Sequence, residues 1–158
     1  MAYKEVTTVG TIEWAKVFED NRDMRGFDGE YEKTEGAYVV DQVLDKDEYQ
    51  KLVNAGSQKK PKQKRLMDGE IVIKMMRPHR VVTRDGRELP QAGGAPEVTD
   101  AEGNPINERI GNGSKAEITN LISTFKGQDG KVYARTTMTK IKITDLVPYE
   151  EKEAEMSW

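Results

Sequence analysis

Two periodicities meet in the stretch Ala37-Tyr-Val-Val-Asp-Gln-Val-Leu-Asp-Lys-Asp-Glu-Tyr-Gln-Lys-Leu-Val-Asn-Ala-Gly56. Over residues 37–44 the large apolar side chains alternate with a period of two, which predicts a β-strand. After residue 44 the apolar positions take the spacing of a helix. Asp45 followed by Glu48 has the spacing of a capping box, and Gly56 is a C-terminal stop signal. We therefore expect a strand that runs directly into one short helix.

Other stretches on both sides of this unit also have strand character. The predicted strands are residues 10–18, 37–44, 70–77, 110–125 and 131–147, the last two forming a long hairpin. The threonines at 136, 137 and 139 predict a β-bulge, and the glycine-rich run 111–114 predicts a tight turn with close backbone packing. Residues 21–36 are expected to form a loop that Phe27 and Tyr31 hold down, with accessory ligand contacts as the alternative for both.

These elements describe a mainly β fold. We predict a five-stranded oligonucleotide-binding (OB) barrel with one short helix and long loops, followed by a disordered acidic C-terminal tail. The helix follows the second strand, whereas the usual OB fold has it between the third and fourth strands. A chain of 158 residues has the length of one domain. We therefore expect one domain at residues 1–148 and a flexible tail at 149–158.

The composition excludes several classes of site. The chain has no cysteine, and His79 is its single histidine, so disulfides, zinc fingers and most cysteine or histidine nucleophiles are excluded. We expect no cofactor, no metal and no enzymatic activity. No stretch approaches the roughly 18 apolar residues of a membrane span, and residues 1–10 lack the pattern of a signal peptide. A soluble cytoplasmic protein without membrane contacts is the expectation.

Positive charge is concentrated in one part of a chain whose net charge is -3. Residues 59–87 contain ten Lys and Arg against three acidic residues, a net charge of +7. Because association follows the local field, this segment predicts a polyanionic ligand. Residues 57–67 contain almost no apolar side chain, so we expect a mobile loop that captures the polyanion, with a merely solvated loop as the alternative. Its basic residues are Lys59, Lys60, Lys62, Lys64 and Arg65.

Cations and aromatic side chains occur together in the predicted sheet. Binding of single strands without sequence readout needs cations along the phosphate backbone and flat side chains on which bases stack. The candidates for phosphate contact are Lys74, Arg77 and Lys115. The candidates for stacking are Trp14, Tyr38 and Phe125, with Tyr133 as a further aromatic of the sheet. For Trp14, a place in the hydrophobic core is the alternative.

Two other chemistries are weakly supported. The run 111–115 is not a phosphate-binding P-loop, because it lacks that spacing and precedes a strand rather than a helix. Asp41, Asp100 and Glu117 could form the acidic site of a metal-dependent nuclease, but no acidic pair has the strand context of such enzymes.

The C-terminal segment is acidic and ends in an aromatic residue. It contains Glu150, Glu151, Glu153, Glu155 and Trp158. An acidic end is commonly only solubilising. A terminal aromatic also suits docking into a hydrophobic notch bordered by basic residues. The tail could therefore lie in the protein's own cationic groove and compete there with nucleic acid.

Several of these stretches resemble a known family. Residues Gly36-Ala-Tyr-Val-Val-Asp41 leading into the helix, 71–76, and 110–115 with the strand behind it are similar to the single-stranded DNA-binding proteins of tailed bacteriophages, in particular the short-tailed phage type. The acidic, aromatic-ended tail and the helix after the second strand are similar as well. The resemblance covers most of the chain from Gly10 onward, and its most specific motif is the Gly-x-Gly-Ser-Lys turn.

The resemblance implies a function and partners. It implies coating of single-stranded phage DNA during replication, recombination and repair in the host cell cytoplasm. The tail would contact the phage DNA polymerase and helicase-primase and mediate self-association, which makes a homodimer possible. Lys74 stands where the family has a groove lysine, and Phe125 where it has a stacking aromatic. Glu35, in place of a basic residue, and Met76, in place of an aromatic, depart from the pattern. The alternative is a phage structural or adaptor protein whose small barrel binds other proteins.

Overall fold

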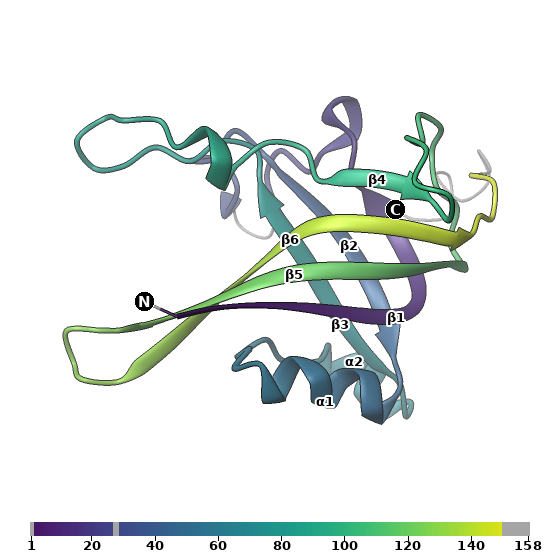
Figure 1. The fold of residues 1–158 in the computed structure, drawn as a ribbon, viewed down its shortest axis with the longest axis horizontal. Helices are drawn as coiled ribbons and strands as arrows, with labels where there is room; N and C mark the ends of the chain where they lie inside the picture. The colour runs from purple at the N-terminus through teal and green to yellow at the C-terminus, as the bar shows by residue number, and fades with distance from the viewer. Residues whose placement is uncertain (1, 27–28, 150–158) are drawn as a thin grey trace.

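The structure, a computed structural model, describes residues 2–26 and 29–149 (Figure 1). Its strands are β1 (Ala2–Lys16), β2 (Ala37–Leu44), β3 (Ile71–Pro78), β4 (Glu97–Asp100), β5 (Ser114–Lys126) and β6 (Val132–Asp145). Its helices are α1 (Lys46–Asn54), α2 (Gln63–Met67) and the short 3-10 turns η1 (Glu19–Asn21) and η3 (Pro90–Ala92). The predicted contributions of Phe27 and of the tail at 150–158 lie outside the described residues.

The strands form one six-stranded sheet in the order β3-β2-β1-β5-β6-β4. Neighbouring strands are antiparallel except for β4 and β6, which are parallel. The long β1 pairs with β2 through one half and with β5 along most of its length, so it links the two halves of the sheet. β3 and β6 approach each other but form no ladder in the described part of the chain, so the sheet is coiled without being closed. A mainly β, OB-like fold with one main helix is therefore confirmed.

One continuous core occupies the inside of this coiled sheet. β2 contributes alternate side chains, among them Tyr38 and Val40, and β3 contributes Ile73 and Met75. Leu52 of α1 closes one end of the core and is 1% exposed. The period-two pattern of residues 37–44 thus has the predicted meaning, because every second residue faces the core.

The helix after β2 begins as expected but with one difference. The Asp45 carboxylate accepts a hydrogen bond from the Glu48 amide at 2.8 Å. The Glu48 carboxylate does not return to Asp45. It accepts the Val9 amide of β1 at 2.7 Å and pairs with Lys51 at 2.8 Å. One half of the predicted capping box is therefore used to attach the helix to the sheet.

The hairpin of β5 and β6 contains both predicted irregularities. Thr119 pairs with Lys140 and Asn120 with Met138, so Thr139 is the extra residue of a bulge. In the turn before β5, a Cβ on Gly111 would lie 2.4 Å from the Pro148 carbonyl oxygen, which only glycine avoids. The far end of the hairpin extends beyond the rest of the sheet (Figure 1).

Three sequence-based expectations need correction. β1 begins at Ala2 rather than at residue 10. Residues 3–5 are exposed one after another, so this half of the strand has no period-two pattern in the sequence. The four-residue β4 was not predicted, since so short a segment has no measurable periodicity. Residues 57–67 are not a mobile loop: they contain α2 and are bonded to both β3 and β6, as described below.

Candidate nucleic-acid interface

The outer face of β2 and β3, opposite the core, combines charged and apolar side chains. Val39 and Asp41 of β2 point to this side and are paired with Met76 and Lys74 of β3. We call this surface the β2–β3 face. It is the face on which OB folds bind oligonucleotides.

Tyr31, from the loop between β1 and β2, covers one part of the β2–β3 face. It is 7% exposed and packs with Ala37, Val39 and Met76 in a small cluster separate from the core. The Lys74 ammonium lies 5.3 Å from the centre of its ring, within cation–π distance. Burial strongly raises the pKa of the Tyr31 hydroxyl, so it stays protonated. The expectation that Tyr31 holds down its loop is confirmed, and the same ring also positions Lys74.

Residues 57–62 lie along the gap between β3 and β6. The Gln58 side chain donates to the Val132 carbonyl and accepts from the Ala134 amide, both at 2.9 Å, as a strand backbone would. On the other side, the Lys62 amide donates to the Val72 carbonyl at 3.0 Å. These bonds fix a segment whose composition predicts mobility.

Lys59 lies in this fixed segment beside Lys74. Burial, and after it the nearby Lys74 cation, lowers the pKa of the Lys59 ammonium. Within the described residues, neither lysine forms an ion pair with a carboxylate. Two cations from distant parts of the sequence therefore share one partly covered spot, where Glu30 acts on Lys59 and Asp23 on Lys74 only from beyond ion-pair distance.

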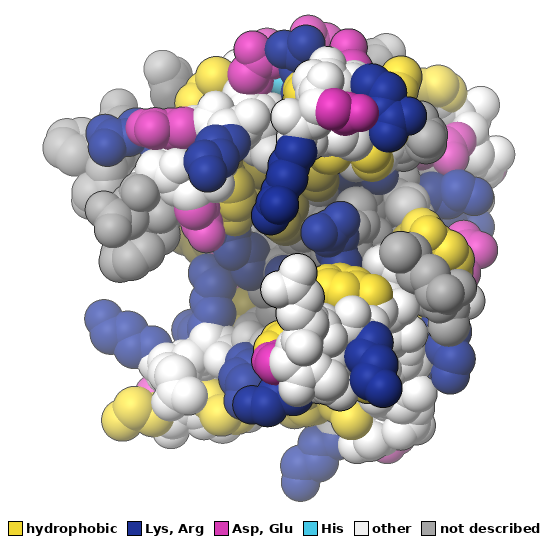
Figure 2. Space-filling model, turned by 90° about the vertical axis from the view of Figure 1, so that its left-hand side faces the viewer, with side chains coloured by type: hydrophobic (Ala, Val, Ile, Leu, Met, Phe, Trp, Pro, Cys, Tyr) yellow, Lys and Arg dark blue, Asp and Glu magenta, His cyan; other side chains and the backbone are white. Residues whose placement is uncertain are grey.

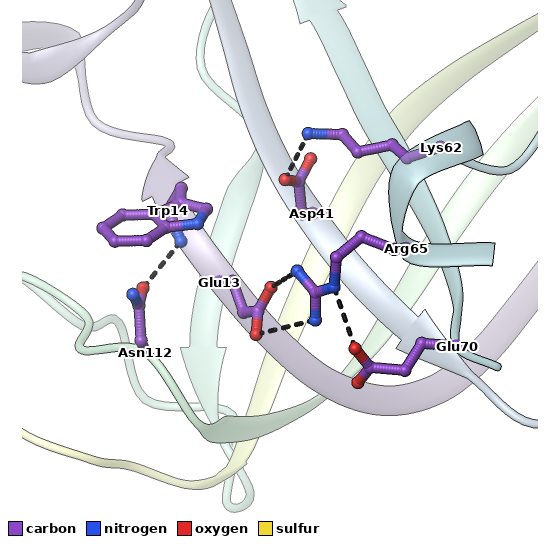
Figure 3. A network of polar contacts seen from close by, with 7 residues as sticks. All are labelled: Glu13, Trp14, Asp41, Lys62, Arg65, Glu70 and Asn112. Carbon is purple, nitrogen blue, oxygen red and sulfur yellow. Dashed lines mark hydrogen bonds and ion pairs between the residues drawn. The ribbon is translucent and has the colours of Figure 1, made fainter. Parts of the chain in front are cut away.

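Lys62 and Arg65 are engaged with carboxylates of the barrel (Figure 3). Lys62 Nζ lies 2.6 Å from Asp41 on β2. The Arg65 guanidinium binds both oxygens of Glu13 on β1, at 2.7 and 3.3 Å, and Glu70 at 2.9 Å. Their charges are thus neutralised inside the molecule. Lys60 and Lys64 of the same segment are exposed.

The two remaining predicted phosphate ligands differ in availability. Arg77 donates to the carbonyls of Gly94 at 2.8 Å and Gly93 at 3.1 Å, and burial lowers its pKa. Its guanidinium therefore holds the loop after β3 in place. Lys115, at the start of β5, is exposed.

The predicted stacking residues also separate into buried and exposed groups. Tyr38 is 1% exposed, faces the core, and its hydroxyl is 2.7 Å from Nδ1 of His79, so a base cannot reach its ring. Its predicted stacking role is contradicted by this burial. Phe125 is 38% exposed, and it stacks with Tyr133 at a centroid distance of 6.0 Å and an interplanar angle of 28°. A hydrogen bond from the Tyr133 hydroxyl to Asp129 fixes the second ring.

Trp14 is exposed rather than part of the core. Its side chain is 44% exposed, and its φ of 53° is rare for a bulky residue. The strained backbone lies at the irregularity between Glu13 and Lys16, and the Trp14 amide donates to Asn112 Oδ1 at 2.7 Å (Figure 3). The ring is thus presented at the surface by a locally strained strand.

Positive side chains surround a hollow on the side of the molecule that holds the hairpin tip (Figure 2). The hollow lies between the hairpin tip and the loops that follow β3. Sequence reasoning missed the contribution of Gln58, because nothing in the sequence indicates that a side chain replaces a strand partner. It named Tyr133 only as an aromatic of the sheet, although the register places it directly opposite Phe125.

The described residues contain no cluster of three or more metal-ligating side chains. Asp41, Asp100 and Glu117, considered above for a nuclease, lie on three different strands, β2, β4 and β5. No helix in the described chain is long and apolar enough to cross a membrane.

Comparison with known proteins identifies the fold through structure rather than sequence. No family model matches the chain, and neither does any curated protein. Among solved structures it is similar to gp2.5, a single-stranded DNA-binding protein encoded by bacteriophage T7. The TM-score is 0.60 at 15% identity, over 99% of this chain and 94% of that one. It is also similar to the C-terminally truncated single-stranded DNA-binding protein of bacteriophage Enc34. There the TM-score is 0.54 at 14% identity, over 94% and 88% of the two chains.

Proposed function

We propose that this chain binds single-stranded DNA without reading its sequence. The observation that carries the proposal is the shared position of Lys59 and Lys74, two partly covered cations of which neither forms an ion pair within the described residues. Neighbouring like charges disfavour each other, and an anion placed between them reverses that cost. The fold shared with two phage single-stranded DNA-binding proteins supports DNA as the source of that anion.

Phosphates and bases would use different parts of the surface. Lys59 and Lys74 would bind the phosphate backbone over the β2–β3 face, with Lys115, Lys60 and Lys64 adding weaker attraction. Bases would stack on the ring pair of Phe125 and Tyr133, and Trp14 is a second exposed ring. Each stacked base contributes roughly 1–3 kcal/mol, and because every base has a π-face, such contacts tolerate any sequence.

The biological role proposed with this activity is protection of phage single strands during DNA replication, recombination and repair in the host cytoplasm. The acidic tail, Glu150 to Trp158, would recruit the phage DNA polymerase and helicase-primase and support a homodimer. The tail's composition and the family resemblance support this part of the proposal.

Titration of a fluorescent oligothymidine at several salt concentrations tests the proposed activity. Counterion release predicts that log affinity falls linearly with log salt concentration, with a slope of about -0.7 for each phosphate neutralised. An oligomer of mixed sequence should bind with similar affinity, and a duplex of equal length much more weakly, because its bases are already stacked inside. A slope near zero, or preference for the duplex, would contradict the proposal.

A further inference from the structure

The Asp41 carboxylate lies on the β2–β3 face next to two lysines, Lys62 and Lys74. It projects from β2 onto the β2–β3 face, and its side chain is only 8% exposed. Its backbone partner across the sheet is Lys74, and its Oδ2 is 2.6 Å from Lys62 Nζ. On the face where DNA phosphate is proposed to bind, an internal anion therefore already holds one cation.

Folding stability alone does not explain a carboxylate in this environment. An ion pair with a nearly buried carboxylate contributes little net stability, because desolvation of the carboxylate offsets the attraction. Lys62 is 43% exposed at its side chain, so an incoming anion can reach the ammonium from solvent while Asp41 stays beneath it. The segment that carries Lys62 leads into α2, which has no buried residue among its five. Lys62 can therefore exchange partners without disturbing the core.

We propose that Asp41 is an internal competitor of DNA phosphate that sets the affinity of this surface. In the free protein Asp41 occupies Lys62, and in the complex a phosphate takes over Lys62 while the uncompensated carboxylate opposes binding. This inference rests on the proposed DNA-binding function. It adds that affinity is held below what the cations of the face could provide, which favours release and redistribution along a strand.

The test is a double-mutant cycle of Asp41→Asn and Lys62→Met, measured as oligothymidine affinity at several salt concentrations. Asp41→Asn should tighten binding at least tenfold at low salt, because a unit charge within about 10 Å of a phosphate has that effect at an effective dielectric constant near 20. Lys62→Met should weaken binding and reduce the salt slope by about 0.7, because one phosphate contact is lost. The two effects should not add, since both depend on the same cation.

Asp20→Asn is the matched control, because Asp20 pairs with Arg109 at 3.2 Å and lies on η1, outside the β2–β3 face. It removes one negative charge and should change affinity much less. If the wild type binds and Asp41→Asn leaves affinity unchanged or weaker, the inference is overturned while the proposed function stands. Absence of binding by the wild type overturns both. If Asp41→Asn fails to fold, Lys62→Met decides: wild-type affinity and slope in that variant would overturn the inference.

Discussion

The basic segment at residues 57–70 and the tip of the β5–β6 hairpin are two parts of the same candidate surface. The first contributes charge and the second contributes aromatic rings. The segment carries five Lys and Arg residues within positions 59–65, yet Lys62 and Arg65 are engaged by carboxylates elsewhere in the molecule. The hairpin tip has no such concentration of charge, yet it exposes a fixed aromatic pair, Phe125 and Tyr133. Charge in a sequence therefore measures potential attraction, while the fold determines which cations are available.

The lysines of the basic segment also differ from one another: some suit long-range attraction of DNA, and others suit fixing its path. Lys60 and Lys64 are exposed, and neither forms an ion pair with a carboxylate of the described residues. They therefore suit long-range attraction of DNA. Lys59 is fixed next to Gln58, whose side chain is bonded to Val132 and Ala134 on either side of Tyr133 at the hairpin tip. The cationic spot and the aromatic pair are thus attached to each other through one glutamine, and a strand bound at both would follow a defined path.

Replacement of Lys59 and Lys74 together should have the largest effect on DNA binding. A hydrogen bond to a charged group is worth about 1.5 kcal/mol or more, so Lys59→Met with Lys74→Met should lower affinity roughly a hundredfold. The salt slope should fall by about 1.4, two phosphate contacts at 0.7 each. Lys46→Met, an exposed lysine on α1, is the matched control. An equal loss in the control would mean that net charge, rather than this cation pair, governs binding.

Removal of an aromatic ring from the hairpin tip should have a smaller effect of a different kind. Tyr133→Ala should weaken oligothymidine binding by roughly 1–2 kcal/mol and leave the salt slope unchanged, because stacking releases no counterion. Tyr133→Phe keeps the ring and removes only the hydrogen bond to Asp129, so it should retain most of the affinity. A changed slope in Tyr133→Ala would instead assign this region to phosphate contact.

The sequence predicted the parts of the molecule that depend on local pattern. The strand at 37–44, its helix and the bulge at Thr139 follow from periodicity, capping and threonine content. The partners of Lys62 and Arg65 could not be predicted in this way. Asp41 lies 21 positions and Glu13 lies 52 positions from the cations they bind, and only the pairing of β2 with both β1 and β3 brings them together.

Local sequence pattern also could not predict which aromatic side chains are buried. Tyr38 and Trp14 both lie in alternating stretches, yet Tyr38 faces the core and Trp14 the solvent. The difference at Trp14 comes from its positive φ at the irregularity of β1, which removes it from the alternation. A period-two pattern assigns faces only where the strand is regular.

The smallest expected effect is on thermal stability and concerns the Arg65–Glu70 ion pair in the basic segment. The hydrogen bond from Arg65 lowers the pKa of the Glu70 carboxyl from its usual 4.5. A carboxyl whose pKa is lower in the folded state stabilises the protein above its unfolded pKa, and this stabilisation is lost as pH falls through the folded value. The thermal midpoint of the wild type should therefore fall more steeply below about pH 5 than that of Glu70→Gln.

At pH 7 the Glu70→Gln variant should melt only about 1–3 °C below the wild type, because an exposed ion pair contributes little. Glu102→Gln, an exposed carboxylate in the turn after β4, should follow the wild-type curve in acid. If Glu70→Gln and the wild type lose stability in parallel as pH falls, the Arg65 network does not hold the basic segment. Its order would then depend on the backbone bond at Val72 and on Gln58, which bind it to β3 and to the hairpin.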